Sequence, residues 1–439
     1  MIKNKLMAMA VTAAIVLPNV ALATNGMFMM GNGTKANGRA GAGIAIADSA
    51  ISGADNPAAM VRVGNRVDFG LQVFQPDRTA EISDNSFGAP FYPVGAFDYK
   101  DEGNNDGPFY IPEMGINYMI NNDMSFGVTV VGVGGMNTNY SGLNMFGPDS
   151  DGETGINLEQ VRILPTLSYK INDQHSVGVS LNVMYQQFKA WGLNSFKTTP
   201  PSSAPNKVSD KGRDDSWGVG LSVGWQGDIT DRLTIGATYN SKVDMDEFDD
   251  YSGLFAEQGG FDVPENYGIG LAFKATDKLM LGFDVQQINY SDVDSIGNSI
   301  QSGDCGTGMS GMCMMMPNKM LGDDNGSGFG WNDMTVYKLG AEYQMNDALT
   351  LRAGWSHSDQ PIDKDQTFMN ILAPAAIEDQ ATVGMTYILP QGSEISMFYM
   401  HAFENDVKGS SSIPATFGGG EADIKMSQDA YGISYGWNF

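Results

Sequence analysis

Apolar and polar residues alternate one by one along many short stretches of the chain. Between residues 349 and 356, for example, Leu349, Leu351 and Trp355 fall on one face and Arg352 falls on the other. A period of two is that of a β-strand with one apolar face, whereas a helix repeats about every 3.6 residues. After residue 23, no stretch reaches the ~18 consecutive apolar residues that a membrane-spanning helix needs. The pattern therefore predicts an all-β chain.

Turn residues divide the alternating stretches into fourteen predicted strands. Short turns rich in Asn, Asp and Gly alternate with longer segments. The short turns lie near 121–123, 172–174, 230–231, 276–277, 346–347 and 390–392, and the longer segments lie near 83–108, 136–158, 191–214, 247–263, 294–333, 361–378 and 409–423. Outer-membrane barrels have short periplasmic turns, long extracellular loops and an even number of strands. We therefore expect residues 66–439 to form a fourteen-stranded antiparallel transmembrane β-barrel.

The last predicted strand has bulky residues on one face and small or polar residues on the other. The bulky residues are Tyr431, Ile433, Tyr435, Trp437 and Phe439. This alternation suits a barrel wall with lipid outside and a lumen inside. A terminal Phe at the end of such a strand resembles the signal that outer-membrane barrels present to their assembly machinery, which we therefore expect as a partner.

The same alternation places two basic residues inside the predicted lumen. Lys338 and Arg352 fall on the face opposite the apolar residues of their strands. A Lys or Arg on the lipid face near the membrane midplane costs about 2–4 kcal/mol, so the lumen is the favourable side. There they could form ion pairs with lumen acids such as Glu342, or they could bind the carboxylate of a ligand.

The first 23 residues have the features of a secretory signal peptide. Lys3 and Lys5 precede an apolar run at 6–17, and Ala21 and Ala23 give an A-x-A cleavage site. Cleavage would remove two lysines and no acidic residue, which changes the net charge from −26 to −28. This acidity argues against a nucleic-acid partner, because binding to phosphates needs clustered Lys and Arg. Many acidic residues fall in the predicted outer loops, where they could bind divalent cations shared with lipopolysaccharide.

Residues 24–65 do not fit the strand pattern. They are rich in Gly and Ala and show no long alternation. Irregular backbone at membrane depth is tolerated only where protein or water surrounds it. We therefore expect this segment to fold inside the barrel as a plug.

Several sequence blocks resemble the FadL family of outer-membrane transporters, which includes the TodX-type hydrocarbon channels. The blocks are G-R-A-G-A-G-I-A-I-A-D-S-A at 38–50, N-P-A at 56–58, Y-N-S-K-V at 239–243 and R-A-G-W at 352–355. The resemblance covers nearly the whole chain after the signal peptide. It implies that residues 24–65 are a hatch that closes the barrel from the periplasmic side, with Asn56, Pro57 and Ala58 as the hatch motif.

The resemblance also implies a route for a lipophilic molecule. Such proteins capture their cargo at extracellular loops, hold it in a lumen pocket, and release it sideways through a kink in the third strand when the hatch moves. The matching strand here contains Gly132, Gly134 and Gly135, and glycines inside a strand often mark a bulge or a bend. We therefore expect the lateral opening at these glycines.

The cargo is less well defined by the sequence. Family members that take fatty acids tend to have basic residues in the pocket, and at the matching stretches only Lys189 remains. Long-chain fatty acids or similar lipophiles are the expected cargo, and an aromatic or alkane hydrocarbon channel is the alternative. A general porin and an adhesin or phage-receptor barrel are alternatives of other classes.

The predicted loop at 294–333 carries a methionine-rich stretch and both cysteines of the chain. Met312, Met314 and Met315 could offer an adaptable apolar landing site for the cargo. Cys305 and Cys313 are expected to form a disulfide in an oxidising compartment. The three histidines lie far apart in the sequence and in no metal or hydrolase motif. We therefore expect no catalytic, metal or cofactor site.

Overall fold

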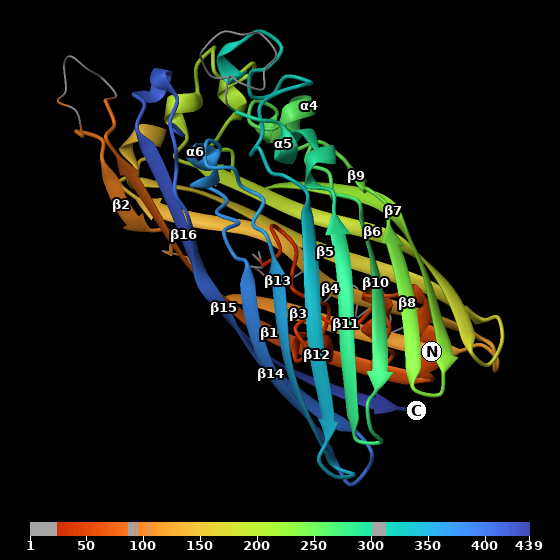
Figure 1. Cartoon of the computed structure of the whole chain (residues 1–439). Coiled ribbons are helices and arrows are strands. Elements are labelled where there is room, and N and C mark those ends of the chain that lie inside the picture. Colours follow the sequence, from red (N-terminus) through yellow and green to blue (C-terminus); the bar gives the residue numbers. More distant parts are fainter. Residues whose placement is uncertain (1–23, 87–92, 94, 105, 301–312) are drawn as a thin grey trace.

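The structure is a computed structural model that describes residues 24–439 except 87–92, 94, 105 and 301–312. The predicted signal peptide therefore lies outside the described residues. In the described part, fourteen antiparallel strands close into a barrel because the first strand pairs with the last over its whole length (Figure 1). The barrel strands are β1 (Arg66–Ser83), β3 (Phe109–Met119), β4 (Met124–Ser141), β5 (Glu153–Lys170), β6 (His175–Trp191), β7 (Asp214–Thr230), β8 (Leu233–Asn240), β10 (Asn266–Lys274), β11 (Leu279–Ile288), β12 (Met334–Gln344), β13 (Leu349–Ser358), β14 (Asp379–Ile388), β15 (Glu394–Val407) and β16 (Glu421–Asn438). The predicted fold class is confirmed.

Short turns join the strands at one end of the barrel and long loops join them at the other (Figure 1). Two short strands, β2 (Tyr99–Glu102) and β9 (Asp244–Met245), extend the sheet in the loop region by pairing with β1 and β7. One predicted loop is shorter than expected. The segment 136–158 is mostly a continuation of the β4–β5 hairpin, in which Met136 pairs with Leu158 and Ser141 with Glu153. Polar residues on both faces of this part hid the strand period.

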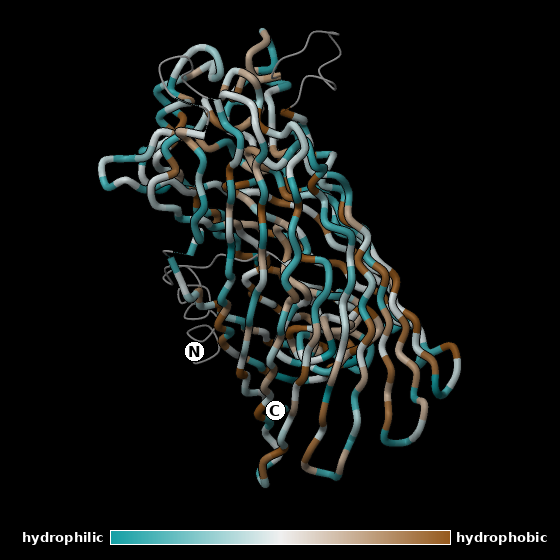
Figure 2. Tube along the Cα trace, turned by 60° about the vertical axis from the view of Figure 1, so that its left-hand side comes forward, coloured by the Kyte–Doolittle hydropathy of each residue, from teal (hydrophilic) through white to brown (hydrophobic). Residues whose placement is uncertain are grey.

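The two faces of the wall differ as predicted. On β13, Leu351 and Trp355 are 38% and 41% exposed, whereas Arg352 between them is 7% exposed. Figure 2 shows hydrophobic positions recurring along the strands, interleaved with hydrophilic ones. No helix in the described part of the chain is long and apolar enough to cross a membrane. The outward apolar residues therefore form the surface that faces lipid.

The loops pack against one another at the loop end of the barrel. They contain one-turn helices: η3 (Asn144–Phe146), η4 (Asn194–Phe196), η5 (Pro205–Lys207), η6 (Asp249–Tyr251), α4 (Ala256–Gly259), η7 (Tyr290–Asp292), α5 (Asp294–Gly297), η9 (Cys313–Met315), α6 (Thr367–Asn370) and η10 (Ala415–Phe417). Four loops meet at a cluster of phenylalanine rings whose contacting pairs have centroids 5.1–6.4 Å apart, formed by Phe146, Phe196, Phe368 and Phe417. Aromatic pairs at this spacing stabilise the packing beyond the burial of their area.

Candidate functional site

Residues 24–65 lie inside the barrel, toward the end with the short turns (Figure 1). The segment contains α2 (Thr34–Asn37), η1 (Ser52–Ala54), η2 (Pro57–Ala59) and α3 (Met60–Val63), and most of its residues are buried. Glycines of the wall let its backbone approach closely. A Cβ atom at Gly340 or Gly354 would lie 2.7 or 2.5 Å from atoms of Arg39. The predicted plug is therefore present, and we call residues 24–65 the hatch.

The Asn-Pro-Ala motif fastens the hatch to the barrel wall. Asn56 Oδ1 accepts a hydrogen bond from Ala58 N at 3.0 Å, which caps the start of η2. Asn56 Nδ2 donates to the carbonyl of Trp225 on β7 at 3.0 Å. The carbonyl of Ala58 accepts hydrogen bonds from two hydroxyls of strands β5 and β6, those of Ser168 and Ser176. Asn56, Pro57 and Ala58 thus connect the hatch to three neighbouring strands.

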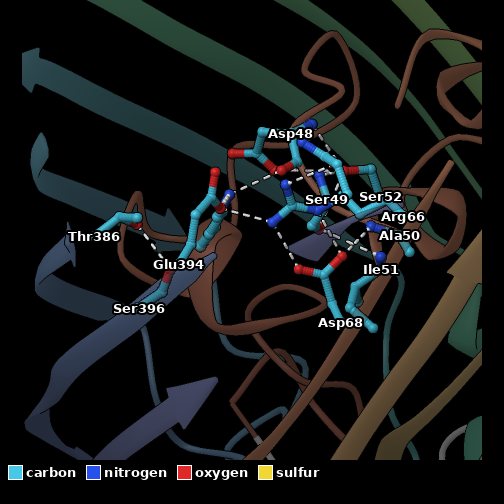
Figure 3. A network of polar contacts seen from close by, with 12 residues as sticks. Asp48, Ser49, Ala50, Ile51, Ser52, Arg66, Asp68, Thr386, Glu394 and Ser396 are labelled. Atoms are coloured by element: carbon cyan, nitrogen blue, oxygen red, sulfur yellow. Dashed lines mark hydrogen bonds and ion pairs between the residues drawn. The ribbon is translucent and has the colours of Figure 1, made fainter. Parts of the chain in front are cut away.

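A partly buried carboxylate on β15 forms ion pairs with two basic groups, one from the hatch and one from the wall. Glu394 Oε2 lies 2.6 Å from both Lys35 Nζ and Arg66 Nη2. Arg66 Nε in turn lies 2.8 Å from Asp68 Oδ2, which also accepts a hydrogen bond from Ala50 N at 2.7 Å. Figure 3 shows Arg66 between Glu394 and Asp68, with residues 48–52 of the hatch beside them. Strands β1 and β15 therefore hold the hatch through carboxylates that accept an ion pair and a backbone hydrogen bond from it.

A second group of ion pairs contains one of the predicted ligand-binding residues. Arg39 Nη1 in the hatch lies 2.8 Å from Asp48 Oδ2 and 2.8 Å from Glu342 Oε2 on β12. The same Glu342 oxygen lies 2.7 Å from Arg352 Nε. Arg352 Nη1 also donates to Thr386 Oγ1 at 2.6 Å. Arg352 therefore forms an ion pair with a lumen acid, which is one of the two roles expected for it. Carboxylate and hydroxyl partners already satisfy its guanidinium.

Buried basic side chains fall into two sets in the part of the chain that the structure describes. Four of them form ion pairs with carboxylates, namely Lys35, Arg39, Arg66 and Arg352. The other three have no carboxylate oxygen within 4 Å among the described residues, and they are Arg78, Arg162 and Lys338. Burying an unpaired charge costs several kcal/mol. Each of the three lines a cavity, so the cost is concentrated where a ligand could offset it.

A cavity of the lumen lies between the hatch and the wall. Its lining combines polar side chains with apolar residues from the hatch and the wall, among them Phe28, Met29, Ile44, Val133 and Met184. A molecule with a polar head and an apolar chain matches such a lining.

Two cations face this cavity, and among the described residues their hydrogen-bond partners are neutral. Arg162 Nε donates to Asn182 Oδ1 at 2.9 Å, and Arg162 Nη2 donates to Ser222 Oγ at 2.8 Å. Lys338 Nζ donates to Gln286 Oε1 at 3.0 Å. Lys338 thus lines the cavity together with a second basic residue, and its role in binding stays a prediction.

Two acidic groups near these cations are engaged by the hatch. Asp55 lines the cavity and accepts a hydrogen bond from Asn32 Nδ2 at 2.8 Å. Asp284 Oδ2 accepts hydrogen bonds from Gly43 N and Ile44 N at 2.7 and 3.0 Å. Hydrogen bonds with hatch residues therefore engage both carboxylates. Among the described residues, neither Arg162 nor Lys338 has an ion pair.

The barrel wall is interrupted at the predicted glycines of β4. Pairing with β3 ends at Val131, and pairing with β5 shifts register between Gly132 and Gly134. Beyond this bulge the free edge of β4 pairs with the leading end of the hatch. Phe28 forms an antiparallel bridge with Gly134, and Gly135 N donates to Met27 O at 3.0 Å. Three hatch residues thus cover a gap between β3 and β4.

The remaining predicted residues lie in the loop region or outside the described residues. Lys189 is at the loop end of β6, with its Nζ 4.7 Å from the ring centroid of Trp191. Met314 is completely buried and Met315 packs against the core. Met312 and Cys305 lie outside the described residues, so the landing site and the disulfide with Cys313 stay predictions.

Sequence reasoning missed Arg162, although its signal was present. Val161 and Ile163 flank it with apolar side chains, which is the same alternation that identified Lys338 and Arg352. The alternation can assign such a residue to the lumen, but it cannot say whether a carboxylate from a distant segment will reach it.

Comparison with known proteins agrees with this architecture. The sequence model of the family described as outer membrane protein transport protein (OMPP1/FadL/TodX) matches residues 16–439. An outer membrane protein of Neisseria meningitidis serogroup B is 24% identical over 58% of this chain and 60% of its own length. A 47 kDa outer membrane protein of Pasteurella multocida is 24% identical over 53% of each chain. The chain thus spans a little over half the length of these curated relatives.

Solved structures show the same fold. A FadL homologue of Pseudomonas aeruginosa superposes with a TM-score of 0.67 at 18% identity, over 94% of this chain and 100% of that chain. The toluene transporter TodX of Pseudomonas putida superposes with a TM-score of 0.64 at 16% identity, over 93% and 99%. With the family match over nearly its whole length, the chain belongs to the OMPP1/FadL/TodX family of outer membrane transport proteins and is itself an outer-membrane protein.

Proposed function

We propose that the chain carries long-chain fatty acids or similar lipophilic carboxylates across the outer membrane. The observation that supports this cargo is a pair of buried cations, Arg162 and Lys338, that line one lumen cavity and have no ion pair among the described residues. A carboxylate between them would make charge-assisted hydrogen bonds, which are about twice as strong as neutral ones. Burial of the alkyl chain against the apolar lining would contribute about 25 cal/mol per Å².

The proposed route runs from the loops to the lumen cavity and then sideways through β4. Its last step uses the gap at Gly132, Gly134 and Gly135. Phe28 and Met29 line the cavity on one side and pair with the edge of β4 on the other. Displacement of these two residues would therefore connect the cavity with the lipid phase.

The alternative functions account less well for the lumen. The toluene transporter TodX shares the fold, and we keep a hydrocarbon channel as the second candidate. A hydrocarbon, however, offers nothing to two buried cations. A general porin needs an open bore, whereas the hatch fills this one, and an adhesin or phage receptor needs neither the cavity nor the interrupted wall.

Two further partners belong to this proposal. Phe439 at the end of the chain is 54% exposed, which makes it accessible to the barrel assembly machinery. Acidic loop residues at the outer surface would contact lipopolysaccharide through divalent cations. We propose both as partners of the barrel.

The test is uptake by cells that lack their own fatty acid transporter and produce this chain. We expect these cells to take up radiolabelled oleate faster than cells without the chain. Arg162→Gln with Lys338→Gln should lower oleate uptake at least about tenfold, because two charge-assisted hydrogen bonds are lost. The matched control is Lys278→Gln, which removes an exposed charge in a short turn and should change nothing. Faster uptake of toluene with no effect on oleate would establish the hydrocarbon channel instead.

A further inference from the structure

Asp284 is an inward-facing carboxylate of the barrel wall, and a cation stands directly across from it. It is 2% exposed and lies opposite Lys338 in the register of the neighbouring strands β11 and β12 (Figure 1). Directly opposed side chains of antiparallel strands have Cβ atoms about 4.5–5.5 Å apart, which lets opposite charges form an ion pair. In the described part of the chain, however, no carboxylate oxygen lies within 4 Å of Lys338 Nζ. The pair that the register favours is therefore absent.

A turn of the hatch holds the Asp284 carboxylate instead. Asp284 Oδ2 accepts hydrogen bonds from Gly43 N at 2.7 Å and from Ile44 N at 3.0 Å. Consecutive backbone N–H groups of a turn form a small concavity that binds anions. Ile46 N donates to Gly43 O at 3.0 Å, so residues 43–46 form a β-turn. We call residues 43–46 the hatch turn.

The carboxylate leans toward β10, on the side away from Lys338. Gly270 of β10 stands opposite Asp284 in the register. A Cβ atom at Gly270 would clash with Asp284 Oδ1 and with Ile44 Cβ. The absence of a side chain there leaves the space in which the carboxylate and the hatch turn meet. Lys338 Nζ, on the other side, donates to the neutral Gln286 Oε1 at 3.0 Å.

Asp284 differs in one respect from Asp55, the other carboxylate at this cavity. Asp55 belongs to the hatch and accepts its hydrogen bond from Asn32, another hatch residue. It would therefore leave together with the hatch, whereas Asp284 would stay in the wall. A buried carboxylate without a partner is costly. Once the hatch turn has left, an ion pair with Lys338 is the arrangement that avoids this cost.

We propose that the hatch turn keeps Lys338 available for the carboxylate of the cargo by holding Asp284 away from it. This inference rests on the proposed transport of lipophilic carboxylates. Asp284 and the two hatch amides are then positioning groups that act through Lys338. Because coupling between two binding events is reciprocal, cargo bound at Lys338 also holds the hatch turn in its seat. The leading end of the hatch makes none of these contacts and can move separately.

The test measures how tightly palmitate and its neutral analogue hexadecanol bind the full chain in lipid nanodiscs. Ile44→Pro removes one of the two amides, and proline suits the second position of a β-turn. The matched control is Ile44→Ala, which loses the same apolar side chain and keeps the amide. We expect palmitate to bind Ile44→Pro about tenfold more weakly than Ile44→Ala. Hexadecanol should bind both variants alike.

Rescue separates the positioning role from a structural role of the turn. Asp284→Asn removes the competing charge and should restore palmitate binding when it is added to Ile44→Pro. The double variant should come within about threefold of Ile44→Ala with Asp284→Asn. Equal palmitate affinity of Ile44→Pro and Ile44→Ala, or a loss that Asp284→Asn does not restore, overturns the inference.

Hydrogen exchange gives a second measurement that leaves the hatch unaltered. Palmitate, but not hexadecanol, should slow exchange at the amides of residues 43–46 in the wild type about tenfold. This slowing should disappear in Asp284→Asn, and equal slowing in both proteins overturns the inference. Oleate uptake without either effect refutes the role of Asp284 alone, whereas a wild type that does not bind palmitate refutes the proposed cargo as well.

Discussion

Removing the negative charge of Glu394 should loosen the hatch without breaking the barrel. Glu394 Oε2 is shared by Lys35 of the hatch and Arg66 of β1, at 2.6 Å from each. Glu394→Gln keeps the size of the side chain and part of its hydrogen bonding. It leaves Lys35 without a carboxylate partner, while Arg66 keeps its ion pair with Asp68 at 2.8 Å. The substitution therefore weakens mainly the contact between the hatch and the wall.

The size of the effect follows from burial. The side chains of Lys35 and Glu394 are 10% and 18% exposed. Breaking a buried pair costs about 3–5 kcal/mol, and the residual exposure argues for the lower end. A loss of about 3 kcal/mol raises the equilibrium constant for hatch opening roughly 150-fold.

Hydrogen exchange measured by mass spectrometry reads this constant directly. With the protein in nanodiscs, the amides of residues 34–52 should exchange roughly 150-fold faster in Glu394→Gln than in the wild type. Amides of β1 and β15 away from residue 394 should keep their protection. The matched control is Glu404→Gln, which removes the partner of Lys425 in an exposed ion pair on the same strand. It should leave the hatch amides unchanged.

The reasoning is refuted if hatch protection in Glu394→Gln stays within about threefold of the wild type, a difference of less than 1 kcal/mol. Such a result would mean that close packing against the wall, not the shared carboxylate, holds the hatch in place. Equal acceleration in the barrel strands would also refute it, because the ion pair would then stabilise the barrel as a whole.

Three further changes probe the hatch at other points. Met29→Cys with Val133→Cys should form a disulfide, because Met29 N lies 3.1 Å from Val133 O and both side chains line one cavity. Oxidation of this double variant should stop oleate uptake, and reduction should restore it. Asn56→Ala removes the cap of η2 and a hydrogen bond to β7. The free energy of opening that hydrogen exchange measures at the motif should therefore fall by about 1–3 kcal/mol. Gly340→Val places a side chain where Arg39 sits, so single-channel conductance should rise, whereas Ala341→Val on the outer face should leave the channel closed.

The strands could be predicted from the sequence because burial in a barrel wall repeats at a fixed period. Each residue of β13 faces lipid or lumen according to its parity, so Leu351 and Arg352 could be assigned without any knowledge of distant contacts. The hatch could be recognised by its lack of this period. The loop-side part of β4 and β5 escaped prediction, because residues such as Asn137 face other protein on both sides and no longer alternate.

The roles of the lumen cations could not be predicted in the same way. Lys338 and Arg352 stand on neighbouring strands in the same phase, and yet one has a neutral partner and the other a carboxylate. Glu342 stands opposite Arg352 in the register of β12 and β13 and forms an ion pair with it. Asp284 stands opposite Lys338, but its carboxylate accepts hydrogen bonds from two backbone amides of the hatch, at residues 43 and 44. Those hydrogen bonds join residues 241 and 240 positions apart in the chain, and local patterns carry no information about them.

The contacts of the hatch divide it into a fixed and a movable part. In the described residues, ion pairs between the hatch and the wall are made by Lys35, Arg39 and Arg62, all of which follow the leading end. The leading end, residues 24–29, contacts the wall through hydrogen bonds and apolar packing alone. Displacing the whole hatch would break three ion pairs with the wall, two of them made by buried cations. Displacing the leading end breaks only a few hydrogen bonds, each worth about 1 kcal/mol. The gap in β4 is covered by this weakly held end, so the proposed lateral release would need only the leading end to move.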